Sequence, residues 1–476
     1  MKEIWDRMRI ISFFLFLIIS NVAFAEKGIV FNDVSRLNPT VVYKIVKVHR
    51  IQDIQNALQE ARIKGVKVSI AGKRHSQGGQ QSCVNCIVLD MFEFNDIISL
   101  DTQNKIIEVQ PGATWEQIQD YVNPYGYAIK VMQASNVFTV GGSLGSDIHG
   151  NDPSYGTIIE TVKSFHLMKA DGSVIKVSRE ENSELFNIVI GGYGLLGVIT
   201  DIDLELTDNV IYVMKSEVMD YTAFPNYFNT RILGNKNVGL FSAKLSNAPD
   251  SLLKQVVSSP YIKVNDKRNK SLFKLHKESW LVFNKFFFGL SRKSGWGKNL
   301  RWCLEKFFVA KVGRTEYICR NNAMRPMIKF LDYYSPKNTD ILQEYFIPID
   351  KFVEFVDGLR KIIKDKGVNL LSITIRYVPH DTRSFLPYAK SNVFSLVLYI
   401  NQGLNAEQVK QAQMWTREMV DLALSAGGTY YLPYQLYPTK EQLLNAYPNF
   451  NEFIEKKRTY DPGSVFMNRF YMQYSN

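Results

Sequence analysis

The stretch Ala71-Gly-Lys-Arg-His-Ser-Gln-Gly-Gly-Gln80 is the most informative part of this sequence. It follows a short apolar run, Val66-Lys-Val-Ser-Ile70, which predicts a β-strand. A strand that enters a glycine-spaced loop gathers several backbone N–H groups in one concave turn, which suits a phosphate or pyrophosphate group. The candidate cofactor-binding residues of this loop are Gly72, Lys73, Arg74, His75, Ser76, Gln77, Gly78 and Gln80.

His75 lies in the middle of the loop, where its imidazole can act as a base or a nucleophile. Two further glycine clusters, at 139–150 and 191–199, strengthen the case for a nucleotide cofactor, because glycine lets the main chain approach a ligand closely. None of the three clusters fits the dinucleotide fingerprint within a βαβ unit, and none fits the P-loop pattern. These patterns argue against a nicotinamide Rossmann enzyme and against an NTPase.

The first 25 residues differ from the rest of the chain. Basic residues precede the apolar run 10–19, and Ala23-Phe-Ala25 has the small-x-small form of a cleavage site. Residues 1–25 therefore predict a secretory signal peptide and an exported protein, periplasmic or secreted. The alternative is an uncleaved N-terminal anchor, which the shortness of the run disfavours. No other segment of the 476 residues is long and apolar enough to predict a membrane span.

Four cysteines follow the predicted signal peptide: Cys83, Cys86, Cys303 and Cys319. Cys83-Val-Asn-Cys86 allows a redox pair or half of a metal site. No second such pair accompanies it, so we predict no metal site. In an oxidising compartment the favoured interpretation is one structural disulfide or two.

Charge is concentrated in the window 254–314, which holds 15 Lys and Arg residues against three acidic ones, while the net charge of the whole chain is +11. The window is also rich in aromatic residues. Basic and aromatic residues at helical spacing suit peripheral contact with an anionic membrane. An ordinary amphipathic helix pair with a buried aromatic face gives the same pattern. Nucleic acid is excluded as a partner because no binding motif accompanies the charge.

A coarse assignment divides the chain into three parts after the signal peptide. Residues 38–208 alternate short strand-like and helical runs, such as a helix over 51–61 and a helix over 115–122 with Thr114 as its N-cap. Residues 209–425 form a second domain, with strands near 344–348, 371–378 and 394–400 and helices over 351–364 and 406–425. Residues 426–476 are short, aromatic and rich in turns, and we expect them to return to the first domain.

Several motifs, in this order along 38–208, resemble the FAD-binding domain of the vanillyl-alcohol oxidase superfamily. They are Ala71–Gln80, Ile87-Val-Leu-Asp-Met91, Val109-Gln-Pro-Gly-Ala-Thr114, the cluster 140–150 and Gly191-Gly-Tyr-Gly-Leu-Leu-Gly-Val-Ile199. The tail, from Ala446-Tyr-Pro to Tyr460-Asp-Pro-Gly-Ser-Val-Phe-Met-Asn468, is similar to aldonolactone and alditol oxidases and to decaprenylphosphoryl-ribose oxidases. The resemblance implies an α+β fold: a two-subdomain FAD-binding domain of the PCMH type and a substrate (cap) domain with an antiparallel sheet.

The resemblance also implies roles for named residues. In relatives with His-Ser at this place in the loop, the histidine is bonded to the 8α-methyl of the flavin, and His75 matches it; the alternative is that His75 only packs beside the ring. The remaining residues that the resemblance assigns to FAD are Gly112, Val140, Gly141, Gly142, Ser143, Gly145, His149, Gly150, Gly197, Val198 and Ile199.

The substrate side rests on a less complete match. Alditol oxidases carry Glu-x-Arg beside the flavin, and here Thr374-Ile-Arg376 keeps the arginine but has Thr374 in place of the acid. Those enzymes also have a lysine where this chain has Tyr434. We take Arg376, Tyr434 and Thr374 as the candidate catalytic residues. Glu344 and Tyr345, in a strand-like run, are further residues that can face the site.

These observations predict an exported FAD-dependent oxidoreductase that oxidises an alcohol carbon of a sugar, sugar lactone, polyol or lipid-linked sugar. Its electron acceptor would be O2 or a membrane carrier. Two alternatives stay open. One is a cytokinin-type or amine-type flavin dehydrogenase, because His75-Ser-Gln-Gly-Gly-Gln80 also resembles the loop of that subgroup. The other is a flavin-binding protein without turnover.

Overall fold

The computed structural model describes residues 28–264, 270–276, 281–311, 317–326 and 328–475. The predicted signal peptide at 1–25 lies outside the described residues, and so do short parts of the basic window 254–314. Within the described residues, no helix combines the length and the apolar content that crossing a membrane requires.

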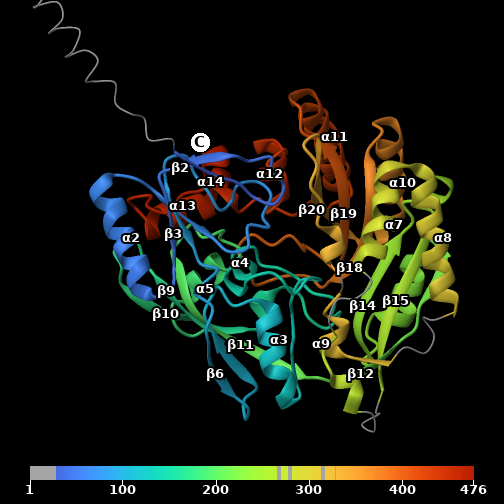
Figure 1. Ribbon diagram of the computed structural model, residues 1–476, viewed down its shortest axis with the longest axis horizontal. Coiled ribbons are helices and arrows are strands. Elements are labelled where there is room, and N and C mark those ends of the chain that lie inside the picture. Colours follow the sequence, from blue (N-terminus) through green and yellow to red (C-terminus); the bar gives the residue numbers. More distant parts are fainter. Residues whose placement is uncertain (1–27, 265–269, 277–280, 312–316, 327, 476) are drawn as a thin grey trace, which may run out of the picture.

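The N-terminal part of the chain contains two main sheets that differ in strand direction (Figure 1). The parallel sheet is formed by β3 (Lys44–Lys47), β5 (Ile87–Asp90) and β4 (Val68–Ala71), in that order. The antiparallel sheet has the order β10 (Val174–Ser178), β9 (Val162–Met168), β11 (Val198–Asp208), β7 (Ile106–Val109) and β6 (Ile97–Asp101), with β8 (Tyr127–Ile129) beside β11. A small antiparallel pair, β1 (Ile29–Phe31) and β2 (Thr40–Val42), precedes them. The helices of this part are α2 (Ile51–Lys64), α3 (Trp115–Val122), α4 (Val140–Gly145) and α5 (Ser183–Val189).

Local sequence explains how these elements begin and end. Helix α2 stops where Gly65 adopts the left-handed conformation, with φ of 66°, which glycine tolerates without strain. Strand β4 starts three residues later and carries the chain into the glycine-rich loop. Helix α3 begins at the predicted cap, because Thr114 Oγ1 accepts a hydrogen bond of 3.3 Å from the backbone N–H of Gln117. Along β11, side chains alternate between buried and half-buried, as a strand with one face on the core requires.

The second part is built on one antiparallel sheet. Its strands lie in the order β16 (Tyr317–Cys319), β12 (Ile211–Met214), β15 (Gln255–Val264), β14 (Val238–Leu245), β18 (Asn369–Val378), β19 (Val393–Gly403), β17 (Asn338–Pro348) and β20 (Thr429–Tyr430), with β13 (Glu217–Asp220) beside β15. Its helices are α6 (Phe224–Tyr227), α7 (Leu281–Lys293), α8 (Gly295–Lys311), α9 (Arg320–Ala323), α10 (Phe352–Asp365) and α11 (Ala406–Ser425). Helices α10 and α11 pack on one another and on strands β17 and β19.

The C-terminal segment lies against the N-terminal part of the chain. It contains α12 (Lys440–Ala446), α13 (Phe450–Tyr460) and α14 (Arg469–Tyr474), which lie beside β2 and β3 in Figure 1. The backbone joins this segment to β4: Val68 N–H donates to the carbonyl of Val465 at 2.8 Å, and Met467 N–H donates to the carbonyl of Val68 at 2.9 Å. The last residues of the chain thus extend the small parallel sheet.

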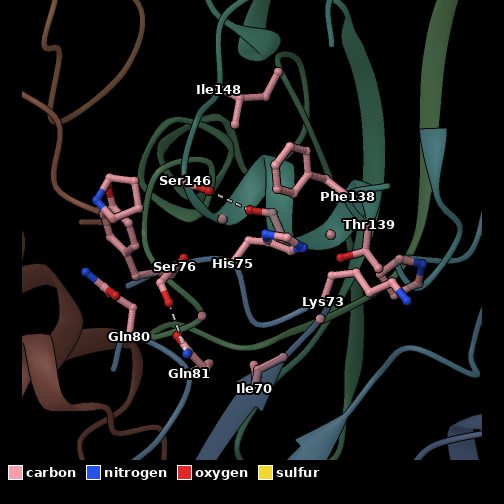
Figure 2. Close-up of a pocket in the computed structure, with 18 of the residues that line it drawn as sticks. Ile70, Lys73, His75, Ser76, Gln80, Gln81, Phe138, Thr139, Ser146 and Ile148 are labelled. Carbon is pink, nitrogen blue, oxygen red and sulfur yellow. Dashed lines mark hydrogen bonds between the residues drawn. The ribbon is translucent and has the colours of Figure 1, made fainter. Parts of the chain in front are cut away.

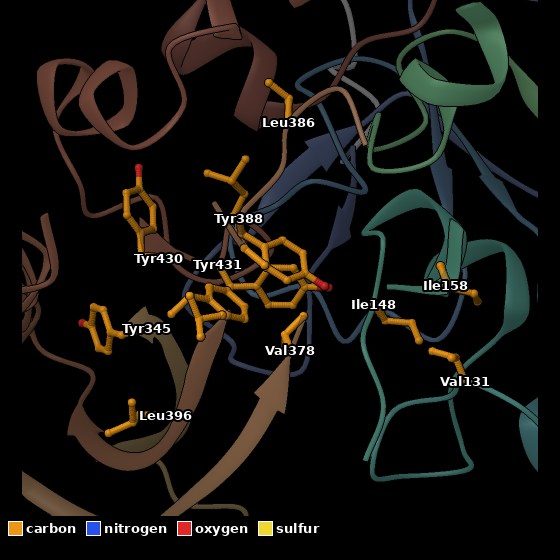
Figure 3. Close-up of a cluster of buried hydrophobic side chains, with 14 of the residues drawn as sticks. Val131, Ile148, Ile158, Tyr345, Val378, Leu386, Tyr388, Leu396, Tyr430 and Tyr431 are labelled. Atoms are coloured by element: carbon orange, nitrogen blue, oxygen red, sulfur yellow. The ribbon is translucent and has the colours of Figure 1, made fainter. Parts of the chain in front are cut away.

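One large apolar core runs through both parts. Figure 3 shows where they meet, with Ile148 and Ile158 from the N-terminal part facing Tyr388, Tyr431 and Val378 from the second part and the C-terminal segment. The core is therefore shared, so the two parts cannot separate without exposing apolar surface.

The predicted α+β fold class is confirmed, with an antiparallel sheet in the second part. The strands expected near 344–348, 371–378 and 394–400 lie within β17, β18 and β19. The helices expected over 351–364 and 406–425 are α10 and α11.

The disulfide interpretation is wrong for this structure, because all four cysteines have free thiols. The Cys86 thiol instead lies 2.7 Å from the carbonyl oxygen of Cys83.

A buried ion pair joins the two parts. Arg320 donates from Nη1 to Asp152 Oδ2 at 2.8 Å and from Nη2 to the carbonyl of Lys130 at 2.7 Å, and both charged side chains are almost fully buried. Arg320→Met should lower the free energy of unfolding by about 3–5 kcal/mol, because it leaves the Asp152 carboxylate buried without its cation. Chemical denaturation measures this change. Arg231→Met, at an exposed arginine, is the control and should change stability little; equal stability of the two variants would show that the buried pair does not join the parts.

Candidate active site

A large pocket lies where the three glycine-rich segments and the C-terminal segment meet, and it encloses about 1330 Å³ of empty space, part of it open to solvent. Figure 2 shows His75 between Ser76 and Phe138, with Ile70 and Lys73 on the strand and loop beside it. The predicted cofactor residues that line the pocket are Gly72, Lys73, Arg74, His75, Ser76, Gln80, Gly141, Gly142, Gly145, Gly197 and Ile199. The fold therefore brings together three segments that the sequence places far apart.

Hydrogen bonds to the C-terminal segment hold the first glycine-rich loop in place. Gln77 N–H donates to the carbonyl of Pro433 at 2.7 Å, and Gln80 Nε2 donates to the carbonyl of Leu432 at 2.8 Å. A Cβ atom on Gly78 would come within 2.5 Å of the Tyr434 carbonyl oxygen, so only glycine permits this close approach. Gln77 and Gly78 thus position the loop.

The cations of the loop have partners of their own. Arg74 Nη2 pairs with Asp90 Oδ2 at 2.5 Å, at the end of strand β5. The Lys73 ammonium lies 3.7 Å from the centre of the Phe92 ring, which is a cation–π contact. Asp90 therefore offsets the positive charge that the sequence predicts for Arg74.

The His75 side chain is half-buried and packs edge-to-face on Phe138, with 4.7 Å between the ring centres. Desolvation, with a smaller contribution from the charge of Lys73, lowers the pKa of His75 to about 4. The imidazole is therefore neutral near pH 7 and keeps a lone pair on one ring nitrogen, which a nucleophile needs.

Some predicted cofactor residues do not line the pocket: Gln77, Gly78, Gly112, Val140, Ser143, His149, Gly150 and Val198. Their contact with FAD stays a prediction, and the structure shows other packing and hydrogen-bonding roles for several of them. Ser143 Oγ donates to Gln133 Oε1 at 2.9 Å, and the Val140 and Val198 side chains are fully buried in the core. A Cβ atom on Gly112 would meet the Met91 carbonyl at 2.1 Å, which shows that this glycine serves loop packing.

A buried polar cluster stands at the aromatic end of the pocket, centred on Glu344 of strand β17. His149 Nε2 lies 2.6 Å from Glu344 Oε1, and Ser395 Oγ donates to the same oxygen at 2.5 Å. Tyr434, which lines the pocket, donates from its hydroxyl to Glu344 Oε2 at 3.2 Å. A carboxylate inside the protein is therefore linked to the pocket through one phenol.

Burial and neighbouring charge set the protonation states of this cluster. Burial by itself would raise the pKa of Glu344, but His149, Arg376 and the Ser395 hydroxyl together hold it below its ordinary value. Burial and the Glu344 charge raise the pKa of Tyr434 well above its ordinary value. Near pH 7 Glu344 is therefore a carboxylate and Tyr434 is a neutral phenol.

The sheet register places the candidate catalytic residues on one face. Arg376 pairs with Ser395, and Thr374 pairs with Val397, which in turn pairs with Glu344 on the far side of β19. Residues that lie opposite one another across antiparallel strands point to the same face. Glu344 therefore supplies a carboxylate in the same row as Thr374, two strands away. Of the three candidate catalytic residues only Tyr434 lines the pocket, whereas Arg376 and Thr374 do not.

Arg376 has one unusual feature. Its Nε atom is buried and has no hydrogen-bond partner within the described residues. A buried guanidinium donor without an acceptor is costly, so it indicates a group that binds there.

The sequence argument missed part of the pocket wall. Tyr431, Tyr193 and Phe138 line it, and the Tyr431 hydroxyl donates to the carbonyl of Ser146 at 2.7 Å. Tyr193 lies within the glycine cluster 191–199, and Tyr431 is three residues before Tyr434. This closeness in sequence to predicted site residues is the signal that could have identified both tyrosines.

The pocket fits FAD. Gly72, Gly142 and Gly145 line it with backbone, and a Cβ atom on Gly145 would meet nothing within 4 Å, so this position opens onto free space. Apolar and aromatic side chains suit the flat ring of a flavin. Among the described residues, no group of three His, Cys, Asp or Glu side chains could hold a metal ion.

Comparison with known families agrees with this geometry. The FAD binding domain model matches residues 43–178, and the D-arabinono-1,4-lactone oxidase model matches residues 264–474. The chain belongs to the vanillyl-alcohol oxidase superfamily of FAD-dependent oxidoreductases. FAD is therefore the cofactor of this superfamily member.

Individual relatives in the superfamily are distant. Decaprenylphosphoryl-beta-D-ribose oxidase of Mycolicibacterium smegmatis is 25% identical over 466 residues, which cover 90% of this chain and 94% of that protein. L-gulonolactone oxidase of Mus musculus is 25% identical over 243 residues, covering 46% of this chain and 54% of that protein. Cytokinin dehydrogenase 9 of Oryza sativa subsp. japonica is 22% identical over 437 residues, covering 87% and 83%.

Gly145 provides a test of the cofactor pocket. Gly145→Leu should weaken FAD binding by about tenfold or more, since a side chain there enters the pocket and a loss of ~1.4 kcal/mol is already a factor of ten. Titration of the FAD-free protein with FAD measures the change. Gly289→Leu is the matched control, because a Cβ atom on Gly289 of helix α7 also meets nothing within 4 Å, but away from the pocket. Equal FAD affinity in both variants would show that FAD does not occupy the part of the pocket beside Gly145.

Proposed function

We propose that this flavoprotein oxidises an alcohol carbon of a sugar, a sugar lactone, a polyol or a lipid-linked sugar. The observation that carries the proposal is the buried Glu344 carboxylate, linked through Tyr434 to the wall of the FAD pocket. The full-length similarity to a decaprenylphosphoryl-ribose oxidase supports the lipid-linked sugar. The match to the lactone oxidase model supports the smaller sugars.

Alcohol oxidation removes a hydride and a proton from the substrate. When bound, FAD supplies a ring that accepts the hydride from the carbon bearing the hydroxyl. The proton needs a separate acceptor, and the Tyr434–Glu344 pair provides one. The Tyr434 oxygen takes the hydroxyl proton of the substrate while its own proton passes to Oε2 of Glu344. The substrate then becomes a carbonyl compound, and Glu344 becomes a carboxylic acid until solvent takes its proton.

His149 and Arg376 assist this step in different ways. His149 lies 2.6 Å from Glu344 Oε1 and holds the carboxylate in its orientation. The unpartnered Nε of Arg376 offers a hydrogen bond to an oxygen on which negative charge develops during the reaction. Thr374, which stands where alditol oxidases have their acid, takes no part in the proton transfer of this proposal.

The proposal includes a covalent bond between His75 and the flavin. Its neutral imidazole lines the pocket and would bond to the 8α carbon of FAD. The methyl group and the imidazole would each lose one proton, two electrons would pass to the flavin ring, and O2 or the membrane carrier would then reoxidise the flavin. The other residues of the loop 71–80 hold the imidazole in position, and in this proposal none of them bonds to the 8α carbon of the flavin.

Export completes the proposal. Residues 1–25 direct the chain out of the cytoplasm, and the reduced enzyme passes its electrons to O2 or a membrane carrier.

One alternative function has a specific observation in its favour. The rice cytokinin dehydrogenase aligns over 83% of its length, which favours oxidation of a side-chain amine. A flavin-binding protein without turnover is the other alternative.

Anaerobic bleaching of the bound flavin tests the function. Sugars, lactones, polyols and a polyprenylphosphoryl sugar are compared with a side-chain amine, and at least one alcohol should bleach the flavin. Bleaching by the amine alone would replace the proposal with the amine dehydrogenase. A flavin that no substrate reduces would support a protein without turnover.

Tyr434→Phe should slow flavin reduction by about 10²–10⁴-fold, because it removes the hydroxyl that accepts the substrate proton. Stopped-flow absorbance under anaerobic conditions measures the rate. Tyr431→Phe is the matched control, since Tyr431 lines the same wall but bonds to the Ser146 carbonyl and not to Glu344. Equal rates for the two variants would exclude the proton path through Tyr434.

His75→Ala should abolish acid-stable flavin while the fold persists, because the bond to the ring needs the imidazole nitrogen. Precipitation with acid followed by fluorescence of the pellet and of the supernatant measures attachment. If yellow, fluorescent flavin still accompanied the precipitated variant, the attachment site would lie elsewhere.

A further inference from the structure

Helices α7 and α8 form a hairpin at one end of the molecule, at the opposite end from α2 (Figure 1). The predicted amphipathic helix pair is therefore present in the basic window. Its inner side chains pack on the sheet: Phe288 and Trp302 are buried, and Trp302 Nε1 donates to Gln255 Oε1 at 2.9 Å. This packing accounts for only part of the aromatic residues.

Both helices of the hairpin also expose aromatic side chains. Trp296 is 66% exposed, Phe286 is 61% exposed and Phe308 is 56% exposed. Single exposed apolar residues are common on protein surfaces, but three large rings on one helical hairpin indicate contact with another apolar phase.

A basic pocket opens at the N-terminal end of α8, beside Trp296. Lys293, Lys298 and Lys364 line it together with Arg292, and no acidic residue is among its described lining residues. Arg292 pairs with Asp340 outside the pocket lining, whereas no acidic partner of the three lysines is found within the described part of the chain. The pocket therefore presents three positive charges without a countercharge.

Lys298 is the best-defined of these cations. It is half-buried, and its ammonium donates to the neutral Asn369 Oδ1 at 2.8 Å. Burial lowers its pKa to about 8, which shows a partly desolvated charge that an anion would stabilise. Gly295, the residue before Trp296, lines the pocket, so the exposed indole ring of Trp296 lies near the pocket rim.

We propose that the basic pocket and the exposed rings of α7 and α8 form a docking site for an anionic phospholipid surface. The phosphate of a lipid headgroup enters the pocket, and Trp296 and its neighbours enter the interfacial layer. Charge complementarity favours this occupant, because lysines attract anionic lipids and aromatic rings prefer the depth of the headgroups. The site lies apart from the FAD pocket and does not depend on the oxidation chemistry proposed above.

Vesicle binding by the FAD-loaded protein tests this proposal. Vesicles of phosphatidylcholine alone are compared with vesicles that also contain phosphatidylglycerol, and the protein should prefer the latter. Lys293→Met with Lys364→Met should weaken that binding by about fivefold for each lysine removed. Both lysines are exposed, so the fold should persist. Trp296→Ser should weaken binding to the same vesicles. Lys298→Arg keeps the charge and should retain binding.

Two variants far from the hairpin serve as matched controls. Lys176→Met removes an exposed lysine from β10, and Ile63→Ser removes a 73% exposed apolar side chain from α2. Both should bind vesicles as the unaltered protein does. Residues 1–25 are the same in all variants, so any contribution they make to binding does not affect the comparison. Equal binding by all variants, or no binding by the unaltered protein, would overturn the proposal.

Inorganic phosphate separates a lipid site from a pocket for a soluble anion. If the lysine variants lost binding of inorganic phosphate but bound anionic vesicles normally, the pocket would serve a soluble phosphate and the membrane proposal would fail. Flavin bleaching by a soluble sugar should be the same in the docking variants and the unaltered protein. Failure of the proposed enzymatic function would thus be seen separately from failure of the docking site.

Discussion

The seam between the glycine-rich loop and the C-terminal segment is the contact on which the rest of this structure depends. Gln80 reaches the Leu432 carbonyl across 352 positions of sequence, and Val68 bonds to Val465 and Met467 on the adjacent strand. These contacts place His75 and Tyr434 on one pocket wall. Because the lining residues come from positions as far apart as Ile70 and Tyr434, the pocket forms only when most of the chain has folded.

Burial favours the neutral form of both His75 and Glu344, but their partners differ. The His75 imidazole is kept neutral, since desolvation and the charge of the nearby Lys73 both lower its pKa. Glu344 is more deeply buried but is surrounded by His149, Arg376 and a serine hydroxyl, so it stays ionised. A neutral imidazole thus lines the pocket and a carboxylate lies behind its Tyr434 wall, and the difference in charge comes from their partners.

The second sheet explains how the acid missing from position 374 can be replaced. Thr374, Val397 and Glu344 form one row across β18, β19 and β17, so a carboxylate moved by two strands still faces the same side. Such an exchange is invisible along one strand of sequence, because the residues involved are 30 positions apart. In the folded sheet the two positions lie in one row on the same face, separated by a single strand.

Local patterns determined much of the fold. The Thr114 cap, the alternation along β11 and the apolar periodicity of α10 and α11 each reflect a rule that acts over a few residues, and the structure follows them. The glycine-rich motifs determined the cofactor class for the same reason, since backbone that approaches a ligand requires glycine. The sequence alone also indicated His75, Tyr434 and Arg376. Only the tertiary structure decided that Ser143 and Val198 turn into the core, that Asp90 offsets the charge of Arg74, and that Glu344 stands behind Tyr434. Each of these outcomes depends on contacts between distant segments, which no local pattern encodes.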